Sequence, residues 1–352
     1  MECGSPMTRT TRGVDVAVVG ATGLVGRELL RVLEERRFPV RDLLPFNSGR
    51  RAGTVRFRGR SIAARGPSLE ALAKASLVFM VSSDEVSLRW GRALAARGVW
   101  VIDDSSAFRL AAGVPLVIPE VNGGELSPRR RLIAGPNCTL TGAAVAAWPL
   151  IRKAGARAAR IASYQAISGA GREALEEFRA QLRGAAAVLR ADDPLGVPKL
   201  VRASALPRMS AFNVIPQVGS FNADGECSEE VKVRGELRKI WGLPRLAVSA
   251  TTVRVPVVRG HSLAFWLETS RPVSPRAAAR ALKGAPGVKL WPEGSYPTPL
   301  EEGGSWPVHV ARIRQGANAR ELAFWIVSDN LLKGAALNSV QIAEVLLKKR
   351  WL

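Results

Sequence analysis

Three glycines at three-residue intervals, placed between an apolar strand and a helix, constrain the fold of this chain more than any other feature. The run Gly20-Ala21-Thr22-Gly23-Leu24-Val25-Gly26 follows a predicted strand over residues 14–19 and opens a predicted helix over residues 24–36. Small residues let the backbone approach a pyrophosphate, and a helix start offers N–H donors and a positive dipole end. The spacing is GxxGxxG, not the commoner GxGxxG, so a tight turn without a ligand is the alternative. The context favours a dinucleotide site that includes all seven residues.

The residues after this turn alternate between short apolar strands and helices. Strands that are apolar throughout are typical of a parallel sheet that is buried on both faces. The first part of the chain is therefore predicted to be a doubly wound, Rossmann-type parallel sheet of the α/β class. We expect its further strands over residues 42–46, 77–81, 99–102 and 132–134, with a helix over residues 86–96.

The pattern changes after Cys138, where longer strands with alternating polarity appear. Such strands indicate a second, α+β domain with a mostly antiparallel sheet. A final helix over residues 330–348 has a pattern that would let it pack back on the first domain. The expected elements are helices over residues 141–154, 172–183 and 228–241, strands over 160–167, 248–258 and 263–268, an excursion over 184–209 and a loop over 291–308.

The end of the second predicted strand indicates which dinucleotide the turn would hold. An NAD site usually has an acidic side chain there for the ribose 2′-hydroxyl. This chain has Asn47-Ser48-Gly49-Arg50-Arg51, without an acid. Two guanidinium groups suit a 2′-phosphate through bidentate hydrogen bonds, although a solvated basic loop is the alternative. We therefore predict NADP as the cofactor, in contact with Ser48, Arg50 and Arg51.

Cys138 is the strongest candidate for a reactive group. It lies in Gly135-Pro136-Asn137-Cys138-Thr139, between a predicted strand and a predicted helix. A thiol at a helix N-terminus is expected to have a lowered pKa, and the thiolate is the reactive form. The backbone N–H of Cys138 and the Asn137 amide could form an oxyanion hole. A buried, inert cysteine is the alternative.

The chain has only two histidines to supply an imidazole. His261 follows an Arg-Gly turn after a predicted strand, and an exposed imidazole there could be a general acid/base because it titrates near neutrality. His309 lies in a strand-like Val-His-Val stretch and is predicted to be structural. The three cysteines are far apart and form no cluster with the histidines, so neither a disulfide framework nor a metal site is expected.

The net charge of +21, from 51 Lys and Arg against 30 Asp and Glu, suits anionic partners. The basic residues are spread along the chain and are mostly Arg, so nucleic-acid binding as the main function is not favoured. Anionic small substrates fit the charge as well. The polar residues 1–13 are expected to form a disordered tail and not a signal peptide, and no apolar run is long enough to span a membrane. A cytoplasmic location is the default expectation.

Eight stretches, in order along the chain, resemble the aspartate-semialdehyde dehydrogenase family. They are GATGLVG, DDSSAFR, PEVN, GPNCT, SYQAISGAG, FNVIPQVG, RVPVVRGHS and SDNLLKGAALNSVQIAE. The resemblance implies NADPH-dependent reduction of 4-aspartyl phosphate to aspartate semialdehyde through a cysteine thioester, with phosphate as leaving group. This step belongs to the biosynthesis of lysine through diaminopimelate, and of threonine and methionine. The resemblance also implies a homo-oligomer, either a homodimer or a homotetramer.

The resemblance assigns a role to individual residues of this chain. Cys138 matches the nucleophile, Gln165 a glutamine that orients the acyl intermediate, and His261 the acid/base. Arg254 matches the arginine for the substrate α-carboxylate, and Glu229 matches the acid for its amine. The remaining matches are Arg109 and Lys232 for phosphate, and Ser168, Gly169, Asn330 and Gln341 for the cofactor. The implied domains are an NADP-binding domain over 14–138, completed by 329–352, and a catalytic and dimerisation domain over 139–328.

The chain departs from the family pattern near the predicted cofactor site. Ser83-Asp84 stands where the family commonly has Gly-Gly, and Arg51 where it usually has Ser. Two other functions stay open. N-acetyl-γ-glutamyl-phosphate reductase resembles this family in fold and cysteine chemistry, but its substrate amine is uncharged, whereas Glu229 favours a free amine. A non-catalytic basic homologue that binds nucleic acid would show strongly salt-dependent affinity without turnover.

Overall fold

The first domain contains a five-stranded parallel sheet, as predicted. The computed structural model describes residues 13–47, 53–190 and 203–352. The sheet order is β2-β1-β5-β6-β7, and all neighbours run parallel. Chain order therefore reverses beside β1, which is where ligands bind in open α/β sheets. The strands are β1 (Val14–Val19), β2 (Val40–Phe46), β5 (Leu77–Met80), β6 (Trp100–Asp103) and β7 (Leu132–Ala134).

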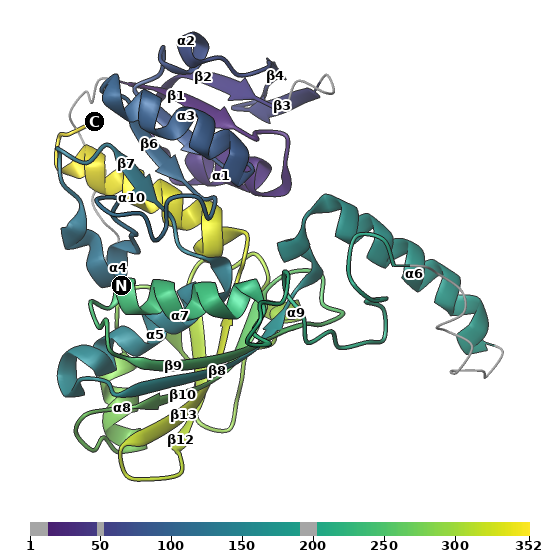
Figure 1. Ribbon diagram of the computed structural model, residues 1–352, viewed down its shortest axis with the longest axis vertical. Coiled ribbons are helices and arrows are strands. Elements are labelled where there is room, and N and C mark those ends of the chain that lie inside the picture. Colours follow the sequence, from purple (N-terminus) through teal and green to yellow (C-terminus); the bar gives the residue numbers. More distant parts are fainter. Residues whose placement is uncertain (1–12, 48–52, 191–202) are drawn as a thin grey trace.

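Helices cover both faces of this sheet, which explains why its strands are apolar throughout. Val16 and Val18 of β1 pack with α1 (Leu24–Glu35) and α10 (Leu337–Lys348). Ala17 and Val19 point to the other face and share a core with α3 (Asp84–Ala96). Figure 1 shows α10, in yellow, lying with the first domain although it comes from the end of the chain. The prediction that the last helix packs back on this domain is confirmed.

The start of that last helix differs from the prediction. We expected one helix over residues 330–348, but residues Leu332–Ala336 form a π-helical turn, η4, before α10 begins. The amide of Ala336 donates to the carbonyl of Leu331, five residues back. Asp329 caps this turn, because its Oδ1 accepts from the amides of Leu331 at 2.8 Å and Leu332 at 2.9 Å.

The second domain contains a six-stranded sheet in the order β11-β12-β13-β10-β8-β9. The pairs β12–β13, β13–β10 and β10–β8 are antiparallel, whereas β11–β12 and β8–β9 are parallel. The sheet is thus mixed and mostly antiparallel, in agreement with the predicted class. Its strands are β8 (Ala158–Gln165), β9 (Ala247–Arg254), β10 (His261–Glu268), β11 (Val288–Leu290), β12 (Val308–Gln315) and β13 (Glu321–Ser328).

Helices α5 (Cys138–Ala154), α7 (Ser228–Ile240) and α8 (Pro275–Leu282) cover one face of this sheet (Figure 1). Helix α5 is buried on nearly all sides. It belongs to one hydrophobic core that includes side chains from both domains. It begins at Cys138, three residues before the predicted start. The Asn137 Oδ1 accepts from the amide of Thr139 at 2.7 Å, which caps the helix.

Several elements were missed or misjudged from sequence. Strand β8 ends at Gln165 and β9 at Arg254, earlier than predicted, and a 3₁₀ turn, η2 (Ile167–Ala170), follows β8. Helix α6 (Arg172–Arg190) is longer than expected and projects from the body of the molecule (Figure 1). The elements not predicted include β3 (Gly53–Phe57), β4 (Arg60–Ala64), α2 (Leu69–Leu72), α4 (Pro119–Asn122), η1 (Gly123–Glu125), α8 and α9 (Pro299–Glu302). Within the described ranges, no helix has the length and apolar character needed to cross a bilayer.

The glycine-rich turn packs too tightly for a side chain at Gly26. A Cβ there would lie 2.2 Å from the carbonyl oxygen of Gly20 and 2.8 Å from Cα of Ala21. Both atoms belong to the backbone, so neither can move aside cheaply. We predict that Gly26→Ala lowers the free energy of unfolding by about 2 kcal/mol, as overpacking does. Urea denaturation measures this loss.

Gly66→Ala is the matched control, because a Cβ there meets nothing within 4 Å. It should leave the free energy of unfolding within about 0.5 kcal/mol of the parent. Equal stability of the two variants would contradict the packing seen at the turn.

Candidate active site

A cavity of about 340 Å³ lies where the carboxyl ends of the parallel strands meet the second domain. It brings together most of the residues singled out from sequence. Those in its wall are Val25, Arg109, Asn137, Cys138, Gln165, Ser168, Gly169, Glu229, Lys232, Arg254 and Asn330. Ser82, Asp104 and Ser106 also line it and were not predicted.

The sulfur of Cys138 contacts the imidazole of His261. The Sγ to Nε2 distance is 3.4 Å, between residues 123 positions apart in the chain. Cys138 is the first residue of α5 and His261 the first of β10. The amide of Ala166 donates to Nδ1 of His261 at 3.0 Å, so Nδ1 must carry a lone pair. A neutral ring then carries its proton on Nε2, facing the sulfur.

The pKa of the thiol runs against the prediction from sequence. Burial, together with the Glu229 carboxylate, raises the pKa of Cys138 to about 11, despite the nearby charges of Arg109 and Arg254. Burial and the charge of Arg254 lower the pKa of His261 to about 3. The expected lowering of the thiol pKa is therefore wrong for the ligand-free protein, because desolvation outweighs the helix dipole. At neutral pH the pair is a thiol and a neutral imidazole.

Arg109 and Glu236 hold the loop that carries the cysteine. Arg109 donates from Nε to the carbonyl of Gly135 at 3.0 Å and from Nη2 to the carbonyl of Asp104 at 2.8 Å. Its Nη1 lies 3.3 Å from Oε1 of Glu236, whose Oε2 accepts from the amide of Asn137 at 2.8 Å. Glu236 was missed from sequence. Its position four residues after Lys232 on the same helix could have indicated it.

Arg254 and Glu229 place opposite charges beside the sulfur. Arg254 is buried and donates from Nη1 to the carbonyl of Ala166 at 2.8 Å. Its Nε is inaccessible to solvent and has no hydrogen-bond partner among the described residues. Glu229 Oε1 accepts from the Thr139 hydroxyl at 2.7 Å, next to Cys138. Such a pair can bind a molecule that carries both a carboxylate and an amine.

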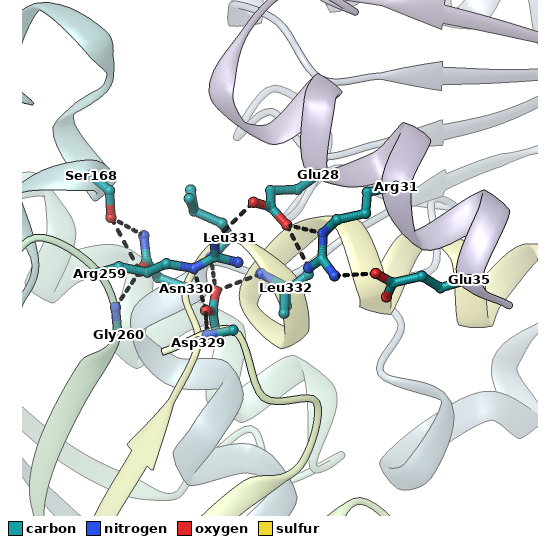
Figure 2. A network of polar contacts seen from close by, with 11 residues as sticks. Glu28, Arg31, Glu35, Ser168, Arg259, Gly260, Asp329, Asn330, Leu331 and Leu332 are labelled. Carbon is teal, nitrogen blue, oxygen red and sulfur yellow. Dashed lines mark hydrogen bonds and ion pairs between the residues drawn. The ribbon is translucent and has the colours of Figure 1, made fainter. Parts of the chain in front are cut away.

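Asn330 joins the turn before His261 to Ser168, which follows β8 (Figure 2). Its Oδ1 accepts from the amide of Gly260 at 2.9 Å, and its Nδ2 donates to Oγ of Ser168 at 3.0 Å. Arg259, the residue before Gly260, donates from Nε to Asp329 at 2.5 Å and from Nη1 to Glu28 of α1 at 2.7 Å. This network ties the helix of the glycine-rich turn to the turn before His261.

Some predicted residues are placed elsewhere. Gln341 does not line the cavity. Its Nε2 donates to Glu120 Oε1 at 3.0 Å, and its Oε1 accepts from Lys333 at 2.7 Å, so its position does not support the predicted nicotinamide contact. Ser48, Arg50 and Arg51 lie outside the described residues. His309 also lies away from the cavity, with Nδ1 3.0 Å from the Trp291 indole nitrogen.

At the departure Ser83-Asp84, Ser83 is the extended residue before helix α3 and Asp84 is its first residue. The Asp84 carboxylate accepts from the amide of Ser106 at 2.8 Å and from its hydroxyl at 2.5 Å. Burial works to raise the pKa of Asp84, but these hydrogen bonds and the charges of Lys232 and Arg109 hold it below its usual value.

The glycine-rich turn fits a dinucleotide. Gly20 has a φ of 87°, a conformation that favours glycine, and a Cβ there would lie 2.3 Å from the carbonyl oxygen of Val81. Helix α1 then starts at Leu24 with no side chain capping its first turn. The first amides of α1 are thus available to an anionic group.

Comparison with known proteins identifies the family. Two family models match: semialdehyde dehydrogenase, NAD binding domain, over residues 15–128, and semialdehyde dehydrogenase, dimerisation domain, over residues 148–333. The aspartate-semialdehyde dehydrogenases of Shewanella violacea and Aquifex aeolicus are 39% and 40% identical to this chain. The alignments cover 95% and 96% of this chain, and 98% and 99% of those proteins.

The chain belongs to the aspartate-semialdehyde dehydrogenase family.

A solved structure agrees with this membership. It is aspartate-semialdehyde dehydrogenase II of Vibrio cholerae complexed with ASA, with a TM-score of 0.89 and 33% identity over 96% of this chain and 99% of that one. The resemblance drawn from the eight motifs is thereby confirmed. As an aspartate-semialdehyde dehydrogenase family member, the chain has an NAD(P)-binding domain and a dimerisation domain.

The raised pKa of Cys138 predicts how the free protein reacts with iodoacetamide. Since the thiolate is the nucleophile, its fraction and hence the alkylation rate should rise about tenfold per pH unit between pH 7 and 10. Mass spectrometry of the Cys138 peptide, with Cys138→Ser as control, measures this rate. Fast alkylation near pH 6, with a plateau below pH 8, would instead indicate a stable thiolate.

Proposed function

We propose that this chain catalyses the NADPH-dependent conversion of 4-aspartyl phosphate to aspartate semialdehyde, with release of phosphate. The observation that carries the proposal is the 3.4 Å contact between Cys138 Sγ and His261 Nε2, beside a cavity that Cys138, Arg254 and Glu229 line. Full-length relatives that are named aspartate-semialdehyde dehydrogenase support this proposal.

The charges of the cavity suit each part of this substrate. We assign its α-carboxylate to Arg254, whose buried Nε has no partner among the described residues. The free amine is assigned to Glu229. Lys232 and Arg109 receive the phosphate, although Arg109 already binds two backbone carbonyls and thus also shapes the cysteine loop. A carboxylate held by an arginine would fix the reacting carbon near the sulfur.

Cys138 acts as the nucleophile. Its sulfur bonds to the acyl carbon, and the carbon–oxygen bond to phosphate breaks with its electron pair going to phosphate. The thiol proton passes to the departing phosphate, because Nε2 of His261 already carries a proton. Because the pKa of the free thiol is about 11, Cys138 is protonated at neutral pH, and its deprotonation accompanies the attack on the substrate. Gln165 and Asn137 lie in the same wall and hold the acyl oxygen.

When bound, the dinucleotide supplies a hydride to the thioester carbon. Cys138 then carries a thiohemiacetal, which collapses to the aldehyde as its hydroxyl loses a proton and the sulfur departs. His261 presents an Nε2 proton to this sulfur, because the Ala166 amide occupies Nδ1. We therefore assign His261 to hydrogen bonding and proton transfer at the sulfur and the adjacent oxygen.

We propose NADP as the preferred dinucleotide. The second strand ends at Phe46 and is followed by Asn47, Ser48, Arg50 and Arg51, without an acid that would bind a ribose 2′-hydroxyl. Two guanidinium groups suit a 2′-phosphate. Ser168, Gly169 and Asn330 are assigned to the nicotinamide side, since they line the cavity with Val25 of the glycine-rich turn.

We also propose that the chain works as a homodimer or homotetramer. The match to a dimerisation domain covers residues 148–333. Exposed apolar side chains in that range, such as Phe212, Val214 and Phe221, are 55–60% accessible and suit burial against a second copy. The domain limits inferred from sequence, 14–138 with 329–352 and then 139–328, stay our proposal.

Cys138→Ser should lower turnover by at least about a thousandfold, because the hydroxyl is far less acidic and less nucleophilic than the thiol. The assay is phosphate-dependent reduction of NADP with aspartate semialdehyde, and NADPH fluorescence follows cofactor binding. Binding of NADPH should survive the substitution. Turnover equal to the parent would remove Cys138 from the mechanism.

The same assay separates the other functions. N-acetylglutamate semialdehyde in place of aspartate semialdehyde tests the related reductase, which should be slow here because Glu229 would face an uncharged amide. Salt-dependent binding of nucleic acid without turnover would favour a non-catalytic role.

Replacing Arg50 and Arg51 by Ser should reduce the preference for NADP over NAD by about tenfold to a hundredfold. This factor corresponds to the free energy of one or two charge-assisted hydrogen bonds. The ratio of kcat/KM for NADP and for NAD measures this. The matched control is Arg56→Ser with Arg60→Ser on the β3–β4 hairpin, which removes the same charge. An unchanged ratio in the Arg50/Arg51 variant would place the 2′-phosphate elsewhere.

A further inference from the structure

Sheet order determines which strands lie between the glycine-rich turn and Cys138. Under the proposed function, a dinucleotide held at the turn after β1 would have to reach the sulfur of Cys138, which follows β7. In the order β2-β1-β5-β6-β7, strands β5 and β6 lie between these two points. Their carboxyl ends lead to Ser82 and Asp104, and both side chains line the cavity that holds Cys138 and Val25.

Ser82 and Asp104 each have a buried polar atom that is left without a partner. Oγ of Ser82 and Oδ2 of Asp104 are inaccessible to solvent and have no hydrogen-bond partner among the described residues. Buried polar atoms in folded proteins are almost always paired. Two such atoms on neighbouring strand ends, in the wall of one cavity, indicate a ligand that supplies the missing bonds.

Neighbouring residues hold the Asp104 side chain in one position. Ser339 of α10 donates from Oγ to its Oδ1 at 2.6 Å. Gly135 leaves the space, because a Cβ at residue 135 would lie 2.3 Å from that same oxygen. Arg109 also holds the main chain here by donating to the Asp104 carbonyl at 2.8 Å. These contacts fix Oδ1 and leave Oδ2 as the oxygen without a partner among the described residues.

We propose that Ser82 and Asp104 bind the nicotinamide riboside half of the cofactor, and that Asp104, when ionised, makes the site prefer the oxidised over the reduced dinucleotide. This inference rests on the proposed function. The oxidised nicotinamide ring carries a positive charge and the reduced ring does not, so a carboxylate beside it stabilises the oxidised form. Asp104 thereby favours hydride donation to the substrate, the direction that the reduction of an acyl phosphate requires.

The charged groups around Asp104 set the pH at which this preference appears. Burial, with the charge of Asp103 on the same strand, raises the pKa of Asp104 to about 7, against the Ser339 hydrogen bond and the Arg109 charge. The other charged or titratable side chains that line this cavity are Arg109, Cys138, Glu229, Lys232 and Arg254. Cys138 has a pKa of about 11, and His261, which contacts it, has a pKa of about 3, so neither titrates near pH 7. Affinity for the oxidised form should thus rise as pH rises through about 7, because more Asp104 is ionised.

The test compares the dissociation constants of NADP⁺ and NADPH between pH 6 and 9, by calorimetry and by NADPH fluorescence. In the parent, the ratio should move by about tenfold in favour of NADP⁺, which corresponds to a shift of one pKa unit on binding. Both forms carry the 2′-phosphate, whose own titration near pH 6 therefore cancels in the ratio. Asp104→Asn should abolish this pH dependence and weaken NADP⁺ by about tenfold above pH 8, with NADPH within about twofold.

Four further variants separate this role from a structural one. Ser339→Ala removes a hydrogen bond that favours the ionised carboxylate, so the pH at which the ratio changes should move upward. Ser82→Ala should weaken both forms by a similar factor, whereas Ser83→Ala, the same change at the exposed neighbour, should weaken neither. Glu85→Gln removes an exposed carboxylate from the first turn of α3 and controls for the general loss of negative charge.

An affinity ratio and pH dependence in Asp104→Asn equal to those of the parent would overturn the inference and leave the proposed function intact. The same holds if Ser339→Ala weakens both dinucleotides without moving the pH of the change. Failure of the proposed function looks different: the parent protein would bind neither dinucleotide or would not turn over aspartate semialdehyde.

Discussion

The contact between Cys138 and His261 depends on one helix that belongs to both domains. The chain leaves the parallel sheet at Ala134 and begins α5 at Cys138, while His261 begins a strand of the second sheet. Because α5 is buried on nearly all sides, a shift of either sheet would have to repack the shared core. The 3.4 Å distance is therefore a property of the whole packing, not of the local sequence.

The same burial that fixes the geometry also makes the ionised forms of the side chains in the site unfavourable. It raises the pKa of Cys138, lowers that of Arg254 and leaves the Arg254 Nε without a partner among the described residues. Arg109 and Glu236 pair with each other and with the cysteine loop, which offsets part of this penalty, although burial still raises the pKa of Glu236. Groups that stay uncompensated until a ligand arrives can give their interaction energy to binding and to the transition state.

Sequence reasoning was most successful where local pattern and packing agree. The apolar strands and the glycine-rich turn follow from local rules, whereas the helix at Cys138 was predicted to start three residues too late. The family resemblance brought Arg254, Glu229 and His261 into one site. The β3–β4 hairpin was missed because its two-residue turn is Arg58-Gly59, both with positive φ, where Asn-Gly is the usual signal. The thiol pKa was misjudged because burial and Glu229 act through tertiary structure, which the helix dipole argument does not include.

The side chains proposed to bind the substrate and the side chain proposed to bind the cofactor differ in how readily they change charge. This difference matches the chemistry of the amino-acid substrate and of the dinucleotide. On the proposed substrate side, Arg254 and Glu229 suit the α-carboxylate and the amine of an amino acid, and neither of these two groups changes its charge during the reaction. On the cofactor side, Asp104 is a carboxyl whose pKa of about 7 leaves it half ionised at neutral pH. The nicotinamide changes its charge with each hydride transfer, so a group that can gain or lose a proton nearby can follow that change. A fixed carboxylate there would stabilise only the oxidised form, and an amide would stabilise neither, which gives a titrating side chain at residue 104 a physical reason to be present.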